Sequence, residues 1–204
     1  MNYSRLNRKL HIYTSLLFFL FILLFAVSGL MLNHRWGIWE YWSKRVETTR
    51  DIEVVLLQEG SDLEKAQDVL RQIEVDGEIH FLLHHVQEGR LEIRTTRPGL
   101  KTTIDVDVGS GRGSIKTIEL DAWELLPSMH VMSGLHSNIP DKKNWIWTQI
   151  WSLMMDLTIV ALVILLGSGF YMWLQLKTER RAGLIFFEIG AALFVLVILG
   201  LAKF

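Results

Sequence analysis

The chain has 204 residues, half of them hydrophobic, and its 21 basic residues nearly balance 22 acidic ones, giving a net charge of −1. It has no cysteine, which excludes disulfides, thiolate metal sites and thioether-linked haem. A charge so close to zero argues against a nucleic-acid-binding protein. Long apolar runs lie at both ends of the chain with most charged residues between them, which is typical of a membrane protein with a polar insertion.

The first apolar run covers residues 10–33 and contains no Asp, Glu, Lys or Arg. A helix needs roughly 20 apolar residues to cross a bilayer, so this run predicts a transmembrane helix after a cytoplasmic tail at residues 1–9. The aromatic cluster that follows is typical of a membrane–water interface. Its members are Trp36, Trp39, Tyr41 and Trp42.

Residues 34–146 form a long polar insertion whose central part, about residues 50–120, predicts a small α+β domain. Ser61 and Asp62 can cap a helix that continues to Ile73 with its apolar residues on one face. Strand candidates follow, because apolar and polar residues alternate between glycine-containing turns. They lie at residues 79–86, 90–96, 103–108 and 114–118. We expect a small sheet with the helix on one face, and amphipathic segments along the outer membrane surface at 120–126 and 129–135.

Two further apolar runs, residues 147–174 and 184–203, predict a second and a third transmembrane helix joined by a short loop at 175–183. The fold class is therefore an α-helical membrane protein with three transmembrane helices and an inserted small α+β domain. Short basic flanks are expected to stay in the cytoplasm. They contain Arg5, Arg8 and Lys9 before the first helix, and Lys177, Arg180 and Arg181 in the loop. The large insertion is then extracytoplasmic, in the inner (cytoplasmic) membrane of a bacterium.

Three sequence patterns are distinctive. The first is RKLH at residues 8–11, followed by an apolar run that ends in SGLMLN at 28–33. The second is IDVDVGSGRGSI at 104–115, and the third is LH at 135–136, then Trp147 and Trp151, then LGSGFYMW at 166–173. With these patterns the chain resembles the PepSY-associated transmembrane family over roughly residues 5–175, and the second pattern resembles a strand and turn of a PepSY domain.

The resemblance implies a PepSY-like extracytoplasmic domain and a link to iron acquisition, because related proteins include haem-containing membrane reductases of ferric siderophores. Longer family members have four or more spans, whereas this chain has three. It also has no glycine-rich motif for a flavin or a nicotinamide on the cytoplasmic side. An electron-carrying role would therefore need a partner protein or a quinol as the reductant.

Histidines expected near the outer face are candidate ligands of a b-type haem, which commonly takes two imidazoles from facing helices. His34 lies just past the first span, and His130 and His136 precede the second. The best pair is His34 with His136 or His130, and the family pattern favours His136. The alternatives are solvated interfacial histidines, or a zinc, copper or iron ion site.

His11 lies at the inner end of the first span, and neither later span contains a histidine. Its second ligand would be Met172 or a partner chain, and the alternative is an ordinary interfacial histidine. Glu188 should lie at a similar depth, where a hydrogen bond to His11 would be geometrically reasonable. Asp156 and Glu188 are candidates for proton relay or for packing, since a carboxylate in a bilayer is costly.

Two further groups have simpler expectations. His80, His84 and His85 lie on one predicted strand, where they are expected to be ordinary sheet-face histidines. Ser28-Gly29 and the run GSG at 167–169 let helices approach closely, or leave room for a flat macrocycle.

Three functions follow from these residues, and whether the chain is an enzyme stays open. The first is a haem-b-binding protein that passes electrons to an outer-face ferric complex. The second is a non-enzymatic, membrane-anchored domain that binds a partner or restrains an envelope peptidase. The third is an accessory subunit of a metal transporter. Each places the chain in a lipid bilayer, with a membrane-protein partner or as a homo-oligomer.

Overall fold

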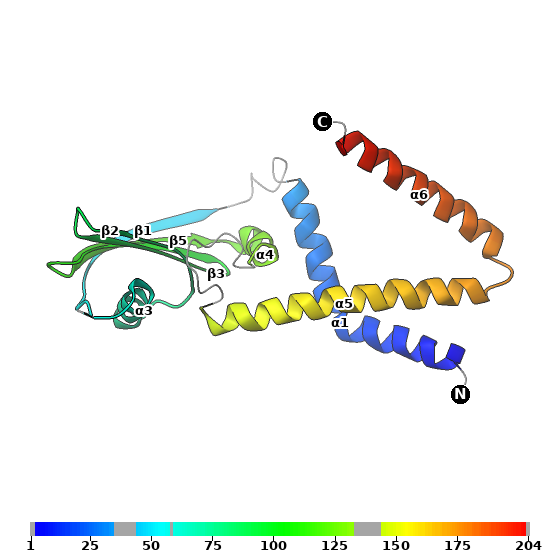
Figure 1. Cartoon of the computed structure of the whole chain (residues 1–204), viewed down its shortest axis with the longest axis horizontal. Helices are drawn as coiled ribbons and strands as arrows, with labels where there is room; N and C mark the ends of the chain where they lie inside the picture. The colour runs from blue at the N-terminus through cyan, green and yellow to red at the C-terminus, as the bar shows by residue number, and fades with distance from the viewer. Residues whose placement is uncertain (1–2, 35–43, 58, 133–143, 203–204) are drawn as a thin grey trace. The chain divides into compact units, whose positions relative to one another are not determined.

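The computed structural model describes residues 3–34, 44–57, 59–132 and 144–202 (Figure 1). Its elements in chain order are α1 (Tyr3–Asn33), β1 (Arg45–Glu53), α3 (Asp62–Gln72), β2 (Glu78–His85), β3 (Arg90–Arg97), β4 (Leu100–Asp107), β5 (Arg112–Leu120), α4 (Ala122–His130), α5 (Ile146–Gln175) and α6 (Arg180–Ala202). The aromatic cluster after α1 and His136 lie outside the described residues.

Three helices in the described part of the chain are long and apolar enough to cross a membrane, namely α1, α5 and α6. Together with the sheet domain between α1 and α5, they confirm the predicted fold class. The contacts divide the chain into two compact units. One consists of Met1–Ile22 and Leu157–Phe204, and the other of Leu23–Asp156.

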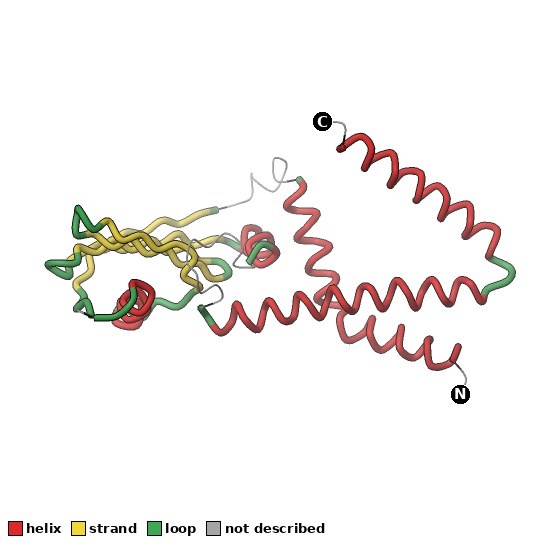
Figure 2. The backbone as a smooth tube through the Cα atoms, viewed as in Figure 1, coloured by secondary structure: helices red, strands yellow, loops and turns green. Residues whose placement is uncertain are grey.

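The sheet has five antiparallel strands in the order β1-β5-β4-β3-β2. Figure 2 shows α3 lying on one face of this sheet. The alternation seen in the sequence explains the arrangement, because every second residue of β3 and β4 points to the helix. Their buried side chains pack with α3 into one core, which includes Leu91, Ile93, Ile104, Val106, Ala66, Val69 and Leu70.

The helix α3 begins as its sequence predicts. The hydroxyl of Ser61 accepts the backbone N–H of Glu64 at 3.3 Å, and the Glu64 carboxylate accepts the backbone N–H of Ser61 at 2.8 Å. This reciprocal capping box satisfies donors that the first turn of a helix leaves without partners. The backbone N–H of Ser61, and then its hydroxyl, which donates to the Glu64 carboxylate at 3.0 Å, lower the pKa of the Glu64 carboxyl.

The structure has a strand, β1, before α3, where the sequence analysis predicts none. Its nine residues are almost all exposed, and polar side chains occupy both of its faces. Only its backbone pairing with β5, from Arg45 opposite Leu120 to Glu53 opposite Arg112, makes it a strand. An edge strand of this kind lacks the alternation of apolar residues on which the prediction rests.

Ile93→Ala is expected to lower the free energy of unfolding of the sheet domain by about 2–5 kcal/mol, because Ile93 is fully buried at the centre of the core. Thermal unfolding of the full chain in detergent, followed by circular dichroism, measures the change. Val46→Ala in β1 is the control, since Val46 is 56% exposed and its loss should cost less than about 0.5 kcal/mol. Equal effects of the two variants would contradict this assignment of the core.

Candidate functional site

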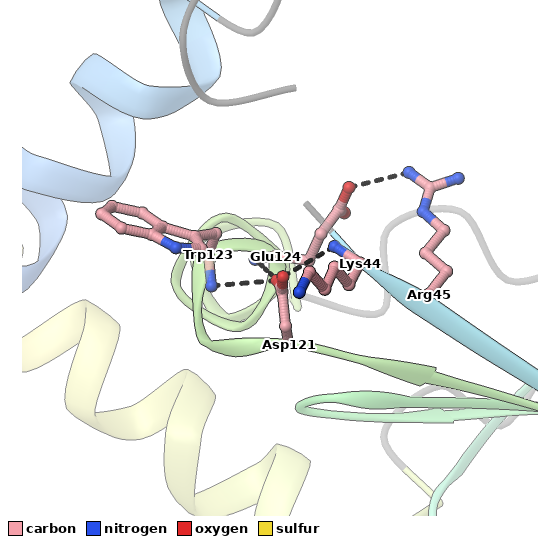
Figure 3. A network of polar contacts seen from close by, with 5 residues as sticks. All are labelled: Lys44, Arg45, Asp121, Trp123 and Glu124. Atoms are coloured by element: carbon pink, nitrogen blue, oxygen red, sulfur yellow. Dashed lines mark hydrogen bonds and ion pairs between the residues drawn. The ribbon is translucent and has the colours of Figure 1, made fainter. Parts of the chain in front are cut away.

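Helix α4 is held against the start of β1 by a network of polar contacts (Figure 3). The carboxylate of Asp121 caps the helix by accepting the backbone N–H groups of Trp123 and Glu124, both at 3.1 Å. It also accepts the backbone N–H of Lys44 at 2.7 Å, and this bond is the main reason why the pKa of Asp121 lies below its usual range. Arg45 reaches over α4 to an ion pair with Glu124 at 2.8 Å. These contacts fix the helix that ends at His130.

His130 contacts Ser28 of α1, and we call these two residues the sheet-side pair. Its Nδ1 lies 2.8 Å from the hydroxyl oxygen of Ser28, which is completely buried. The next residue is Gly29, where an added Cβ would lie 3.4 Å from Cε1 of the His130 ring. A larger residue at this position would therefore press on the imidazole.

Aromatic side chains surround the sheet-side pair. The ring of Phe25 lies edge-on to His130 with 5.4 Å between ring centroids, and 5.9 Å from the ring of Trp151. Trp151 in turn donates its indole N–H to the carbonyl oxygen of Met129 at 3.1 Å. The imidazole is therefore held among apolar rings, with its position fixed from both α1 and α5.

A second serine and histidine meet in the other unit, and we call them the N-terminal pair. Nδ1 of His11 in α1 lies 2.8 Å from the hydroxyl of Ser168 in α5, which is 5% exposed. Asn7, one turn earlier in α1, donates its side-chain amide to the carbonyl oxygen of Ser168 at 3.0 Å. Gly169 follows the serine, and an added Cβ there would lie 3.8 Å from Cε1 of His11. The two pairs thus share one construction on different helices.

Hydrogen bonding assigns the tautomer of His130. The hydroxyl of Ser28 lies 2.7 Å from the carbonyl oxygen of Leu24, the length of an O–H···O hydrogen bond, so Ser28 donates to its own helix. Nδ1 of His130 is then the donor to Ser28, and Nε2 carries the lone pair. The hydroxyl of Ser168 lies 3.1 Å from the carbonyl of Leu165 but 2.8 Å from Nδ1 of His11, so either the hydroxyl or Nδ1 can donate across the latter contact. An imidazole whose Nε2 carries the lone pair can bind a metal or accept a proton.

The comparison with known families bears on the whole chain. The model of a family described as "Putative PepSY_TM-like" matches residues 5–202. The chain belongs to the PepSY-TM-like family. No curated protein and no solved structure matches this family member. The match covers both serine–histidine pairs and all three apolar helices, and it confirms the predicted family.

Of the histidines predicted as haem ligands near the outer face of this PepSY-TM-like chain, the structure describes His34 and His130. His34 is exposed at the end of α1, and its Nδ1 lies 3.1 Å from the carbonyl oxygen of Leu30. A carbonyl can only accept, so His34 also carries its lone pair on Nε2. His136 lies outside the described residues, whereas His130 is placed on α1 by Ser28. The sheet-side pair could not be read from the sequence, because 102 residues separate its members.

Glu188 and Asp156 are both exposed, and within the described residues neither carboxylate has a hydrogen bond or an ion pair. The hydrogen bond to Glu188 that would be geometrically reasonable for His11 is not among the contacts of the described residues, and Nδ1 of His11 contacts Ser168 instead. Helix α6 meets α5 near its own start, where the ring of Phe187 lies 6.0 Å from that of Phe170. Met172 is half-buried, and no described contact links it to His11.

The histidines of β2 behave as sheet-face residues. His84 lies 3.2 Å from the Asp62 carboxylate, and His85 lies 4.0 Å from that of Glu92. Burial, followed by the charges of Arg94 and Lys101, lowers the pKa of His80 below its usual range. Across the described residues, no group of three or more His, Asp or Glu side chains could hold a metal ion.

A buried carboxylate joins the sheet to the start of α5. Glu78 is 2% exposed and accepts the backbone N–H groups of Asn144 and Trp145 at 3.0 and 2.8 Å. The side chain of Asn144 completes the contact, since it accepts the N–H of Ile79 at 3.0 Å and donates to its carbonyl at 2.8 Å. This clamp of Glu78 and Asn144 sets where the second span begins.

Glu78→Gln is expected to loosen the start of α5, because an amide carries no charge to offset the helix N-terminus and offers a single acceptor oxygen. The loss should be about 1–3 kcal/mol of local stability. Hydrogen–deuterium exchange of the peptide that covers residues 144–150 measures it in the full chain. Glu88→Gln, in the exposed β2–β3 turn, is the control. Unchanged exchange in Glu78→Gln would contradict the role of the clamp.

Stability of the sheet domain is expected to fall as the pH drops below about 6.5, since the unfolded chain then takes up a proton at His80 before the folded chain does. Above that pH both states are neutral at this residue, so His80 contributes no slope. Unfolding temperatures of wild type and His80→Gln, compared at about pH 7.5 and 5.5, measure the effect. The variant should lose less stability on acidification than the wild type, and an equal loss in both would contradict the role of His80.

Proposed function

We propose that this PepSY-TM-like protein binds b-type haem through His130 and His11 and passes electrons to a ferric complex on the side of the sheet domain. The observation that supports the proposal is the shared hydrogen bonding of these histidines. Nδ1 of each lies 2.8 Å from the hydroxyl of a buried serine, so Nε2 is the ring nitrogen left for a ligand. Two separate sites with the same construction favour a role for the imidazoles beyond packing.

The donor set fits a haem. Imidazole is a common axial ligand of b-type haem, and ligand histidines usually donate their other ring N–H to an oxygen that fixes the tautomer and ring orientation. At the sheet-side pair, the second ligand would come from His34, just past the end of α1, or from His136, six residues after His130 in the sequence. At the N-terminal pair, Met172 or a partner chain would supply it.

The residues of this chain have separate roles in the proposal. Ser28 and Ser168 orient the imidazoles, and Gly29 and Gly169 leave the space in which the rings lie. Phe25 covers one side of His130, and Trp151 packs against Phe25. Haem b, when bound, supplies a one-electron redox centre inside the apolar part of the membrane. Electrons would come from a quinol or from a cytoplasmic protein.

The proposal includes an orientation and a partner. The basic flanks favour a cytoplasmic N-terminus in a bacterial inner membrane, with the sheet domain outside. Asp156 and Glu188 are exposed on apolar helices, and carboxylates in a bilayer usually face protein or water. We therefore expect a membrane-protein partner, or a second copy of the chain, to cover at least one of them.

The test is a reduced-minus-oxidised visible spectrum of the full-length protein, purified in detergent from cells with ample haem. A b-type spectrum is expected, and His130→Ala and His11→Ala should each remove about half of it. Ser28→Ala should retain haem at the sheet-side pair but raise its midpoint potential, since the imidazole loses the hydrogen bond that makes it more electron-rich. His84→Ala, in the sheet domain, is the matched control and should leave the spectrum unchanged.

A folded but colourless protein would contradict the proposal. It would leave the partner-binding domain and the transporter subunit as the remaining candidates. Loss of function on removing the sheet domain, with the helices intact, would then favour the partner-binding domain. A spectrum that survives in both histidine variants would contradict the ligand assignment and leave haem binding itself in place.

A further inference from the structure

A cavity of about 240 Å³ opens where the β3–β4 turn meets α4 and the end of α1. Its apolar lining includes Leu32 of α1, Val131 and Met132. Leu32 is the last apolar residue of the first membrane-spanning run. The cavity therefore lies at the level where α1 leaves the hydrocarbon, which is the level of lipid headgroups.

Helix α4 has the character of a segment at this level. Trp123 is 43% exposed on it, and tryptophan is enriched at membrane–water interfaces. The helix also ends at His130, whose Nδ1 lies 2.8 Å from the hydroxyl of Ser28 in the membrane-spanning α1. The end of α4 therefore lies against the span. The mouth of the cavity thus faces the boundary between lipid and water.

The polar lining is cationic. Arg97 and Lys101 flank the tight β3–β4 turn, where Arg97 pairs with Leu100 and Lys101 pairs with Thr96. Neither side chain forms an ion pair with any described residue. The carboxylate that also lines the cavity, Glu124, is already paired with Arg45 at 2.8 Å.

The positive charges of Arg97 and Lys101 contrast with the net negative charge of the insertion. Residues 35–146 hold 14 basic and 19 acidic residues, a net charge of 14 − 19 = −5. Most other cations of the sheet have a carboxylate partner, as Arg90 has in Asp105 and Lys116 in Glu47. An arginine and a lysine kept without carboxylate partners at the membrane level are suited to an anion, and a guanidinium matches the geometry of phosphate oxygens.

We propose that this cavity binds the phosphate headgroup of an anionic phospholipid from the leaflet on the side of the sheet domain. Arg97 and Lys101 contact the phosphate, Thr96 and Ser128 supply hydroxyl groups beside it, and the acyl chains lie along Leu32 and Met132. The apolar side of the cavity is the reason to prefer a lipid over a free phosphate. Binding would fasten the β3–β4 turn to the membrane independently of any haem.

The test measures the lipid retained by the full-length protein. The protein is delipidated in detergent, mixed with phosphatidylglycerol or with phosphatidylcholine of the same acyl chains, and examined by native mass spectrometry. Phosphatidylglycerol should bind about tenfold more tightly than phosphatidylcholine to the wild type. The double variant R97Q/K101Q should lose this preference, and each single variant should lose part of it.

The control is R50Q/K65Q, which removes the same charge from the exposed Arg50 of β1 and the half-buried Lys65 of α3, away from the cavity. It should keep the preference for phosphatidylglycerol. An equal loss in both double variants would overturn the proposal in favour of general electrostatic attraction. Displacement of the lipid by millimolar inorganic phosphate would overturn the lipid as the ligand. Equal retention of both lipids by the wild type would overturn the site altogether. Unfolding temperature checks that each variant is folded.

Discussion

The carboxylate of Glu78 joins the sheet domain to the second span, and the geometry of the compact unit Leu23–Asp156 depends on this contact. A buried carboxylate is costly unless hydrogen bonds satisfy it. Glu78 has two backbone N–H donors at the first residues before α5, where the positive end of the helix dipole also favours a negative charge. At the opposite edge of the sheet, Asp121 connects β1 to α4. Both edges of the sheet are therefore connected to elements that lead to the membrane.

This connection explains why His130 reaches α1. Helix α4 is capped by Asp121 at one end and ends at His130 at the other. The imidazole then lies among Ser28, Phe25 and Gly29 because α4 has a fixed start and a fixed length. The N-terminal pair needs no such scaffold, since two long helices bring His11 and Ser168 together directly. The same chemistry is thus reached by two different structural routes.

Much of the fold could be predicted from the sequence because its signals are local. The spans follow from uninterrupted apolar runs, α3 from its capping box, and four strands from alternation. Strand β1 could not be predicted, because pairing with β5 holds it in place and its own residues are polar on both faces. The sequence predicts amphipathic pieces at 120–126 and 129–135. The described helix α4 runs through Pro127 and ends at His130, and residues 133–135 lie outside the described residues.

The candidate site was predictable only as a list of residues. His11, His34 and His130 stood out as histidines near the ends of apolar runs, and the Ser-Gly pairs stood out as small residues. That these two groups would meet depends on contacts between residues 102 and 157 positions apart, which no local pattern encodes. A similar depth in the membrane makes a hydrogen bond between His11 and Glu188 geometrically reasonable from the sequence. In the structure, Nδ1 of His11 contacts Ser168 instead.

The side chain of Asn144 affects the edge of the sheet that β2 forms. By binding both the N–H and the carbonyl of Ile79, it occupies the backbone groups through which β2 could pair with a strand of another molecule. Unprotected edges are common starting points of aggregation. Proteins held in a membrane diffuse in two dimensions, so their domains meet often and in similar orientations. One asparagine at the start of a span thus keeps neighbouring copies of this domain from joining their sheets at that point.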